Sequence, residues 1–137
     1  MKITFELENP DSIELLDELG LRRGLERACA LVERKAKEKA PKDTGALRRS
    51  ITSEIGYEAG EMVGTVFTPL EYAPYVEYGT GLFAESGNGR KDVPWNYQDD
   101  KGEWHSTRGQ QPQPFMRPAL NESREEILRI IKEALHD

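Results

Sequence analysis

The chain of 137 residues has the length of a single domain, with 36% apolar residues, 32% charged residues and a formal net charge of -6. This acidic balance disfavours a dedicated nucleic-acid binder, because the overall field of the protein repels phosphate backbones. The single cysteine, Cys29, excludes an internal disulfide and a thiolate metal cage, and its apolar helical surroundings predict a buried, unreactive thiol. The alternating start of the chain and the lack of an apolar run of about 20 residues predict neither a signal peptide nor a membrane span, so we expect a soluble protein of the cytoplasm in which it is made.

The N-terminal part of the chain predicts one strand and two helices. Alternating apolar side chains predict a half-buried strand over residues 2–8. Apolar residues at helical spacing then predict a short helix over residues 13–19, which Gly20 would end. A longer amphipathic helix follows over residues 21–39, and its apolar face consists of Leu21, Leu25, Ala28, Cys29, Val32 and Ala36.

Residues 40–51 mark the point where the apolar period changes from helical to alternating. Pro41 cannot continue a helix, because its ring clashes with the preceding turn and it lacks an N–H group. Residues 43–45 (Asp-Thr-Gly) offer side chains that can cap a new helical turn and a glycine that tolerates unusual backbone angles. The stretch therefore predicts a rigid corner, with one helical turn over residues 46–49 and a strand from Ser50.

Two alternating stretches after this corner predict a β-hairpin. Residues 51–57 and residues 62–67 carry the alternation, and residues 58–61 (Glu-Ala-Gly-Glu) form the turn between them.

Residues 70–81 are rich in tyrosine. Pro74 suits the first turn of a short helix, and Gly79 would end it. We interpret the tyrosines as packing anchors rather than a platform for stacking bases, because they do not follow the spacing of alternate strand positions. The name tyrosine ledge is used below for Tyr72, Tyr75, Glu77 and Tyr78.

Residues 82–111 lose the regular pattern and are expected to form a flexible, hairpin-like excursion. Within them, residues 93–97 and residues 103–107 predict a second, weaker hairpin around a mobile tip. Long irregular segments in small domains usually serve a function or become ordered on a partner. Trp95 and Trp104 are therefore interface candidates.

The C-terminal part of the chain predicts a helix with Pro118 in its first turn. We expect one domain over residues 1–137, of the α+β class, in which a small antiparallel sheet packs against the long N-terminal-half helix and this C-terminal helix. The predicted buried stripe of the last helix consists of Leu120, Ile127, Leu128, Ile131, Ala134 and Leu135.

No pattern in the sequence predicts catalysis, a metal ion or a cofactor. His105 and His136 are the only histidines and stand isolated from each other, which makes a poor metal site. Residues 99–100 (Asp-Asp) are interpreted as a turn tip rather than an acid and base pair. The glycines lack the lysine and hydroxyl residue that complete a phosphate-binding loop. We therefore do not expect an enzyme.

Three segments are more specific together than any one of them. They are the corner at residues 40–51, residues 72–80 (Tyr-Ala-Pro-Tyr-Val-Glu-Tyr-Gly-Thr) and residues 112–119 (Pro-Gln-Pro-Phe-Met-Arg-Pro-Ala). In this order, between a long helix and a final one, they resemble the head–tail joining family of long-tailed bacteriophages, the gene-product-ten-like tail-completion or neck proteins. The resemblance covers most of the chain from about Leu21 onward, and residues 83–108 carry no match.

The resemblance implies a structural virion protein of a phage or prophage, made in the cytoplasm of the bacterial host and carrying no cofactor. Family members are α+β proteins that form a ring, commonly a hexamer, between the head connector and the tail tube. The implied partners are other copies of the chain, the head-closure or connector protein, and the tail terminator or tail tube protein. DNA would be met only as it passes through the lumen of the ring.

The same resemblance suggests an assembly surface. We expect the corner, the tyrosine ledge and the start of the last helix to meet in three dimensions. The competing interpretation is that these side chains pack the domain's own core, and we favour it for Leu47, Tyr75 and Phe115. The candidate residues are Arg48, Arg49, Tyr72, Tyr75, Glu77, Tyr78, Trp95, Trp104, Phe115 and Arg117.

Two other functions stay open from the sequence. The first is a different minor tail protein, such as a tail terminator. The second is a nucleic-acid-binding protein that uses the basic cluster from Lys35 to Arg49. The lysines at the end of the long helix have a simpler explanation, because positive charge there interacts favourably with the helix dipole.

Overall fold

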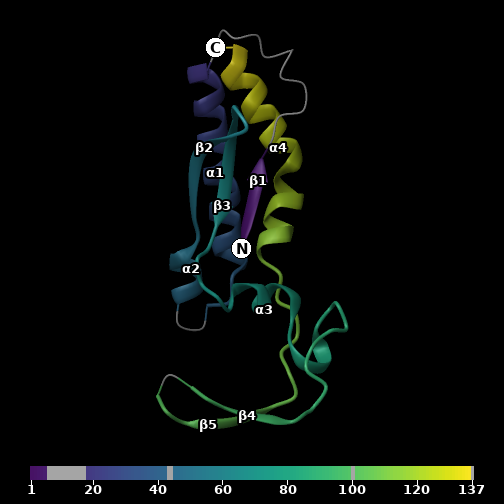
Figure 1. Ribbon diagram of the computed structural model, residues 1–137. Coiled ribbons are helices and arrows are strands. Elements are labelled where there is room, and N and C mark those ends of the chain that lie inside the picture. The colour runs from purple at the N-terminus through teal and green to yellow at the C-terminus, as the bar shows by residue number, and fades with distance from the viewer. Residues whose placement is uncertain (6–17, 43–44, 100, 137) are drawn as a thin grey trace. The chain divides into compact units, whose positions relative to one another are not determined.

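The structure is a computed structural model that describes residues 1–5, 18–42, 45–99 and 101–136 (Figure 1). The chain divides into two compact units. The core unit consists of Met1–Pro69 and Phe115–Asp137, and the loop unit consists of Leu70–Pro114. The assignment of the whole chain to one domain stays a prediction.

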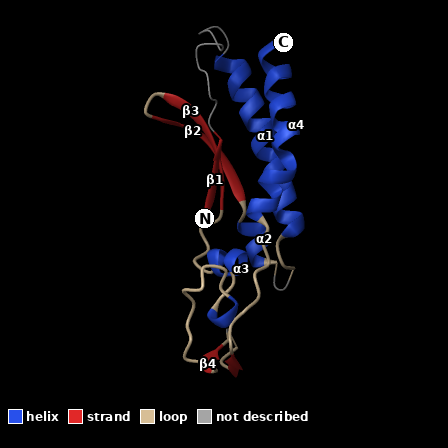
Figure 2. Ribbon diagram, turned by 90° about the vertical axis from the view of Figure 1, so that its right-hand side faces the viewer, coloured by secondary structure: helices blue, strands red, loops and turns tan. Residues whose placement is uncertain are grey.

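The core unit has two layers, a three-stranded antiparallel sheet and two long helices that cover one of its faces (Figure 2). The strand order is β1-β3-β2, and α1 contacts α4 as well as β2 and β3. This arrangement confirms the predicted α+β class. The elements of the core unit are β1 (Lys2–Phe5), α1 (Glu18–Lys39), α2 (Ala46–Ser50), β2 (Thr52–Glu58), β3 (Glu61–Phe67) and α4 (Met116–His136).

Helix α1 ends at Lys39, as the sequence predicts, but its N-terminal part differs from the prediction. Gly20 does not end a helix, because α1 continues through both Gly20 and Gly24. A glycine in a helix interior costs about 1 kcal/mol relative to alanine, which the packing of a long apolar face can offset. Residues 13–17 of the predicted short helix lie outside the described residues. The buried face consists of Gly20, Gly24, Leu25, Ala28, Cys29, Leu31, Val32 and Ala36.

Gly24 marks a close approach between α1 and α4. A Cβ atom at this position would lie 3.1 Å from the Cβ of Ala134 and 3.4 Å from the Cα of Ile131. Because the first of these distances is tighter than an ordinary contact, a glycine is what allows the two helices to pack this closely.

The corner joins α1 to the sheet. Gly45 has φ 79° and directly precedes α2, which begins at the residue that the sequence predicts. Strand β2 starts at Thr52 and not at Ser50, because Ser50 still belongs to α2 and its Oγ donates a hydrogen bond of 2.6 Å back into that turn. Residues 43–44, the predicted helix caps, lie outside the described residues.

Strands β2 and β3 form the predicted hairpin. Ala59 and Gly60 have φ values of 51° and 83°, and positive φ at both positions suits the two-residue turns that join twisted strands. Strand β3 is buried more continuously than a strict alternation predicts, since Met62, Val63 and Val66 are all buried. The reason is its central position, with β1 paired on one side and β2 on the other.

Helix α4 buries a stripe that is rotated from the predicted one. Leu128 was expected in the core, yet 57% of its surface is exposed. The stripe instead starts from Phe115 and Met116 and repeats every three to four residues, which leaves Leu128 on the outer side. The buried residues of this segment are Phe115, Met116, Ala119, Ser123, Ile127, Ile130, Ile131 and Ala134.

The loop unit contains a short helix and a separate hairpin. Helix α3 starts next to Pro74 and ends before Gly79, as predicted, and Gly79 has φ 82°. The second hairpin is also present, as a two-stranded antiparallel sheet of its own. The elements are α3 (Ala73–Tyr78), the 3-10 helix η2 (Gly81–Phe83), β4 (Trp95–Gln98) and β5 (Trp104–Thr107).

Two stretches of backbone cross closely in the loop unit. The N–H of Thr80 donates to the carbonyl of Gln110 at 2.9 Å, and the N–H of Leu82 donates to the carbonyl of Arg108 at 3.0 Å. A Cβ on Gly81 would overlap with the carbonyl oxygen of Arg108. This crossing therefore requires glycine. Within the described ranges, none of the helices combines the length and the apolar character that crossing a membrane requires.

Candidate functional site

The candidate assembly residues divide between the two units. Arg48, Arg49, Phe115 and Arg117 belong to the core unit, and the tyrosine ledge, Trp95 and Trp104 belong to the loop unit. That the corner, the ledge and the start of α4 meet stays a prediction.

The side chains expected to pack the core separate into two groups. Leu47 and Phe115 are buried, which agrees with the packing interpretation, and Glu77 is also fully buried. The expectation for Tyr75 is wrong, because 59% of its surface is exposed. Tyr75 lies on the exposed face of α3, which has only six residues. The apolar period of so short a segment cannot tell which of its faces is buried. Trp104 is more exposed still, at 69%.

A groove of about 650 Å³ runs through the loop unit beside α3. Its lining combines the aromatic rings of Tyr75, Tyr78 and Trp95 with the polar side chains of Asn88 and Arg90. The guanidinium carbon of Arg90 lies 5.0 Å from the ring centroid of Trp95, a cation–π geometry. Exposed aromatic rings with a few polar groups are typical of surfaces that bind another molecule.

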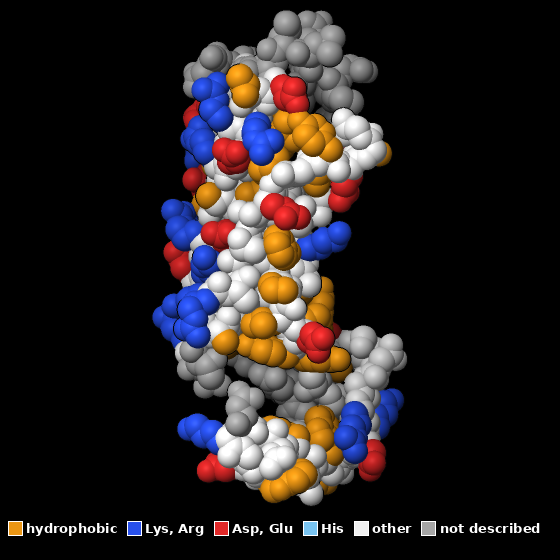
Figure 3. Space-filling model, turned by 60° about the vertical axis from the view of Figure 1, so that its left-hand side comes forward, with side chains coloured by type: hydrophobic (Ala, Val, Ile, Leu, Met, Phe, Trp, Pro, Cys, Tyr) orange, Lys and Arg blue, Asp and Glu red, His pale blue; other side chains and the backbone are white. Residues whose placement is uncertain are grey.

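Two lysines of the basic cluster around the corner form ion pairs with acidic side chains. Lys37 lies 3.6 Å from Glu33, and Lys39 donates to Glu122 at 2.8 Å. On the face drawn in Figure 3, Lys and Arg side chains are interspersed with Asp and Glu and do not form one continuous basic patch. Such pairing reduces the field that would attract a phosphate backbone. Arg48 lines a small groove with α1, and its buried Nε and Nη2 atoms have no hydrogen-bond partner among the described residues.

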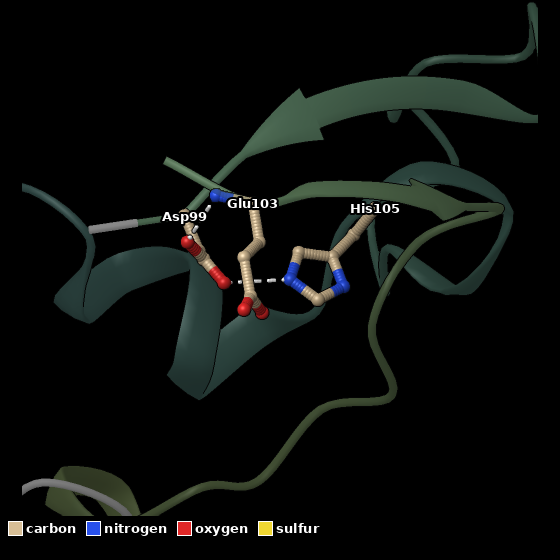
Figure 4. Close-up of side chains that lie close together, drawn as sticks. All are labelled: Asp99, Glu103 and His105. Atoms are coloured by element: carbon tan, nitrogen blue, oxygen red, sulfur yellow. Dashed lines mark hydrogen bonds and ion pairs between the residues drawn. The ribbon is translucent and has the colours of Figure 1, made fainter. Parts of the chain in front are cut away.

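Three polar side chains converge on one face of the β4–β5 hairpin (Figure 4). They are Asp99, Glu103 and His105, and their nearest ligand-type atoms all lie within 4.8 Å of one another. The Nε2 of His105 lies 2.7 Å from the Oδ2 of Asp99. The rings of His105 and Tyr97 stack with centroids 5.3 Å apart.

The turn between the two strands holds Asp99 firmly. Its Oδ1 accepts the backbone N–H groups of Lys101 and Glu103, each at 2.9 Å. The hydrogen bond from His105, followed by that from the backbone of Glu103, lowers the pKa of the Asp99 carboxyl below its ordinary value. Asp99 is therefore a carboxylate at neutral pH, and the cluster offers one imidazole and two carboxylates.

Sequence reasoning missed this cluster, although a signal for it was present. The predicted hairpin already placed residues 93–97 opposite residues 103–107. Side chains two residues apart on a strand share a face, and cross-strand partners share it too. In the structure Tyr97 pairs with His105, and counting outward from this pair puts Asp99 and Glu103 on that same face. The histidine was instead judged by its distance in sequence from His136.

Cys29 behaves as the sequence predicts. The side chain is buried in α1, and burial raises the pKa of the thiol to about 12. The charge of Glu33 adds to that rise. A thiol in this setting stays protonated at neutral pH, and protonated thiols are poor nucleophiles and poor metal ligands.

Comparison with known proteins gave one match. A family model described as "Bacteriophage HK97-gp10, putative tail-component" matches residues 11–79, half of the chain. The match includes the corner and the whole tyrosine ledge. No curated protein and no solved structure matches the chain.

Proposed function

The chain belongs to the HK97-gp10-like family of bacteriophage tail components, and on that premise we propose that it is a virion subunit that joins the head connector to the tail. In this role several copies form a ring. The subunit contacts its neighbours in the ring, the head-closure protein on one side, and the tail terminator or tail tube on the other. Its contribution is structural, and DNA passes through the lumen without specific recognition.

The observation that carries this proposal is the concentration of exposed apolar side chains in the loop unit. Ten large apolar side chains are exposed among the described residues, and seven of them belong to the loop unit: Tyr72, Tyr75, Tyr78, Leu82, Phe83, Tyr97 and Trp104. Aromatic residues are enriched at protein interfaces, and contiguous exposed apolar surface usually marks such an interface. A subunit whose work is to contact other chains accounts for this surface.

The paired charges of the core unit favour assembly over nucleic-acid binding. Several basic side chains near the corner are already matched by nearby carboxylates, and the chain as a whole is acidic. A ring that surrounds DNA without holding it needs this absence of a strong positive field.

Deletion of the gene from the phage that encodes the chain tests the role. Electron microscopy of lysates is expected to show filled heads and complete tails that are not joined. Tails of uncontrolled length would instead assign the chain as a tail terminator. Salt-dependent binding of the purified chain to DNA would favour the nucleic-acid-binding function.

Complementation of the deletion tests the surface. Trp104→Ala is expected to leave the fold intact and to lower the yield of joined particles. Leu128→Ala is the matched control, because this side chain is also large, apolar and exposed but lies on α4 of the core unit. A normal yield of joined particles with Trp104→Ala would contradict the proposal that the loop unit is part of the assembly surface.

A further inference from the structure

We propose that Asp99, Glu103 and His105 form a binding site for a zinc-type divalent transition-metal ion on the β4–β5 hairpin (Figure 4). The three side chains supply one imidazole nitrogen and two carboxylate oxygens. Zinc in proteins uses these donor types, whereas calcium and magnesium prefer oxygen ligands alone. The proposed role in the virion does not require such an ion, so the two proposals stand or fall separately.

Strand pairing brings the three donors to one face. Tyr97 pairs with His105 in the register of the hairpin, and the N–H of Asp99 donates to the carbonyl of Glu103 at 2.9 Å. Asp99 and Glu103 are thus each two residues from a member of that pair. In Figure 4 the two carboxylates and the imidazole ring point toward a common region beside the hairpin.

The donor separations, which reach at most 4.8 Å, are close enough for one small ion after the exposed Glu103 side chain adjusts. Two donors that each lie about 2.1 Å from a zinc ion are roughly 3.0 to 3.4 Å apart. The 2.7 Å between His105 Nε2 and Asp99 Oδ2 need open by only a few tenths of an ångström. Binding replaces this hydrogen bond, and the neutral imidazole then carries its proton on Nδ1 while Nε2 faces the metal.

Two of the three ligands are already oriented. The backbone N–H groups that hold Asp99 Oδ1 leave Oδ2 directed at His105. Stacking on Tyr97 fixes the plane of the His105 ring. Bonds of this kind, made by atoms that do not touch the metal, orient ligands and raise affinity in protein metal sites.

The competing explanation is a hydrogen-bonded clasp between Asp99 and His105 that needs no ion. Glu103 separates the two explanations, because the clasp uses only its backbone N–H and carbonyl. Its carboxylate is exposed and lies within reach of the other two donors. A metal site requires that carboxylate, and a clasp does not.

A bound ion would have a structural effect on the hairpin. Strands β4 and β5 have four residues each, and among the described strands they pair only with each other. Hairpins of this size are marginally stable alone. Three ligands from both sides of the turn would tie the two strands together at the turn end of the hairpin, and at least one coordination position would remain for water.

Isothermal titration of the untagged full chain with ZnCl₂ tests the proposal. We expect one ion per chain, with Glu103→Gln and His105→Gln each weakening binding roughly tenfold or more. The control variants are Cys29→Ser, which removes the single thiol of the chain, and His136→Ala, which removes the other imidazole, and both are expected to bind like the parent chain. An excess of MgCl₂ or CaCl₂ is expected not to compete.

The visible spectrum of the Co²⁺-loaded chain and amide hydrogen exchange supply independent readouts. The absorption of bound Co²⁺ is expected to change in Glu103→Gln, which preserves the clasp. Exchange of the backbone amides in β4 and β5 is expected to slow when Zn²⁺ is added. The proposal is overturned if the chain does not bind Zn²⁺, or if Glu103→Gln binds it as tightly as the parent. Loss of binding in His136→Ala alone would also overturn it.

Discussion

The two units of the chain differ in what holds them together. The core unit buries a continuous set of apolar side chains between a sheet and two long helices, whereas the loop unit keeps most of its aromatic rings at the surface. The loop unit relies on backbone hydrogen bonds, glycines with positive φ and a turn fixed by Asp99. The core unit therefore buries most of its apolar side chains, and the loop unit leaves most of its aromatic rings exposed, so we expect substitutions in the two units to differ in their effect on stability.

The largest difference in the free energy of unfolding is expected between substitution of a buried leucine and substitution of an exposed tryptophan. Leu25 is 1% exposed on α1, and Leu25→Ala is expected to lower the free energy of unfolding by about 2–5 kcal/mol, because it leaves a cavity. Trp104→Ala in the loop unit is expected to change it by less than about 0.5 kcal/mol. Urea unfolding followed by circular dichroism measures both values. Equal losses would mean that the loop unit contributes to the fold as much as the core does.

A smaller loss of stability is expected from a substitution at the close approach of α1 to α4. Gly24→Val places side-chain atoms against Ala134 and Ile131, and overpacking of this kind costs about 1–3 kcal/mol. Gly56→Val is the matched control, because a Cβ there meets nothing within 4 Å and valine favours strands. Thermal unfolding of the two variants compares them. If the Gly24→Val chain were as stable as the Gly56→Val chain, α1 and α4 could move apart without a loss of stability.

Within the loop unit, two glycines with positive φ are expected to differ. Gly81→Ala and Gly87→Ala both introduce backbone strain of roughly 1–2 kcal/mol, since φ is 60° and 73°. Only Gly81 also faces the carbonyl of Arg108, so only this variant should break the crossing. Hydrogen exchange of the Leu82 amide is the measurement, and it is expected to accelerate in Gly81→Ala while α1 keeps its protection. Similar acceleration in both variants would assign the effect to strain alone.

The sequence predicted the parts of this fold that local chemistry determines. Pro41 and Gly45 bracket the corner, and Ala59 and Gly60 provide the turn of the first hairpin, so these boundaries agree within two residues. The order of the strands and the central place of β3 could not follow from local patterns, because they depend on pairing with the distant β1.

Errors arose where tertiary packing overrides a local signal. Glycine commonly ends helices, but Gly20 lies inside α1 on its buried face. Leu128 is apolar, yet the stripe that starts at Phe115 leaves it exposed. The Asp99, Glu103 and His105 cluster was missed for a different reason: alternation along the predicted hairpin places the three residues on one face, but the register of β4 and β5 that brings them side by side does not follow from the sequence pattern. The candidate assembly residues stay predictions, because they concern other chains.

The smallest expected effect concerns one ion pair between α1 and α4. The hydrogen bond from Lys39 Nζ to Glu122 and the charge of Lys39 lower the pKa of the Glu122 carboxyl. A lowered pKa in the folded state means that the pair stabilises the fold above the ordinary glutamate pKa. That stabilisation is lost as the pH falls through the folded-state pKa. The contribution is small, because both side chains are in part exposed to solvent.

Comparison of Lys39→Met with the parent chain across pH isolates this pair. The parent is expected to be slightly more stable at about pH 7, and the difference is expected to shrink as the pH falls below the ordinary glutamate pKa and through the lower pKa of the folded state. Lys132→Met removes the same charge from α4 and controls for the change in net charge. A difference for Lys39→Met that persists at the acidic end would have to come from the packing of the lysine stem and not from its bond to Glu122.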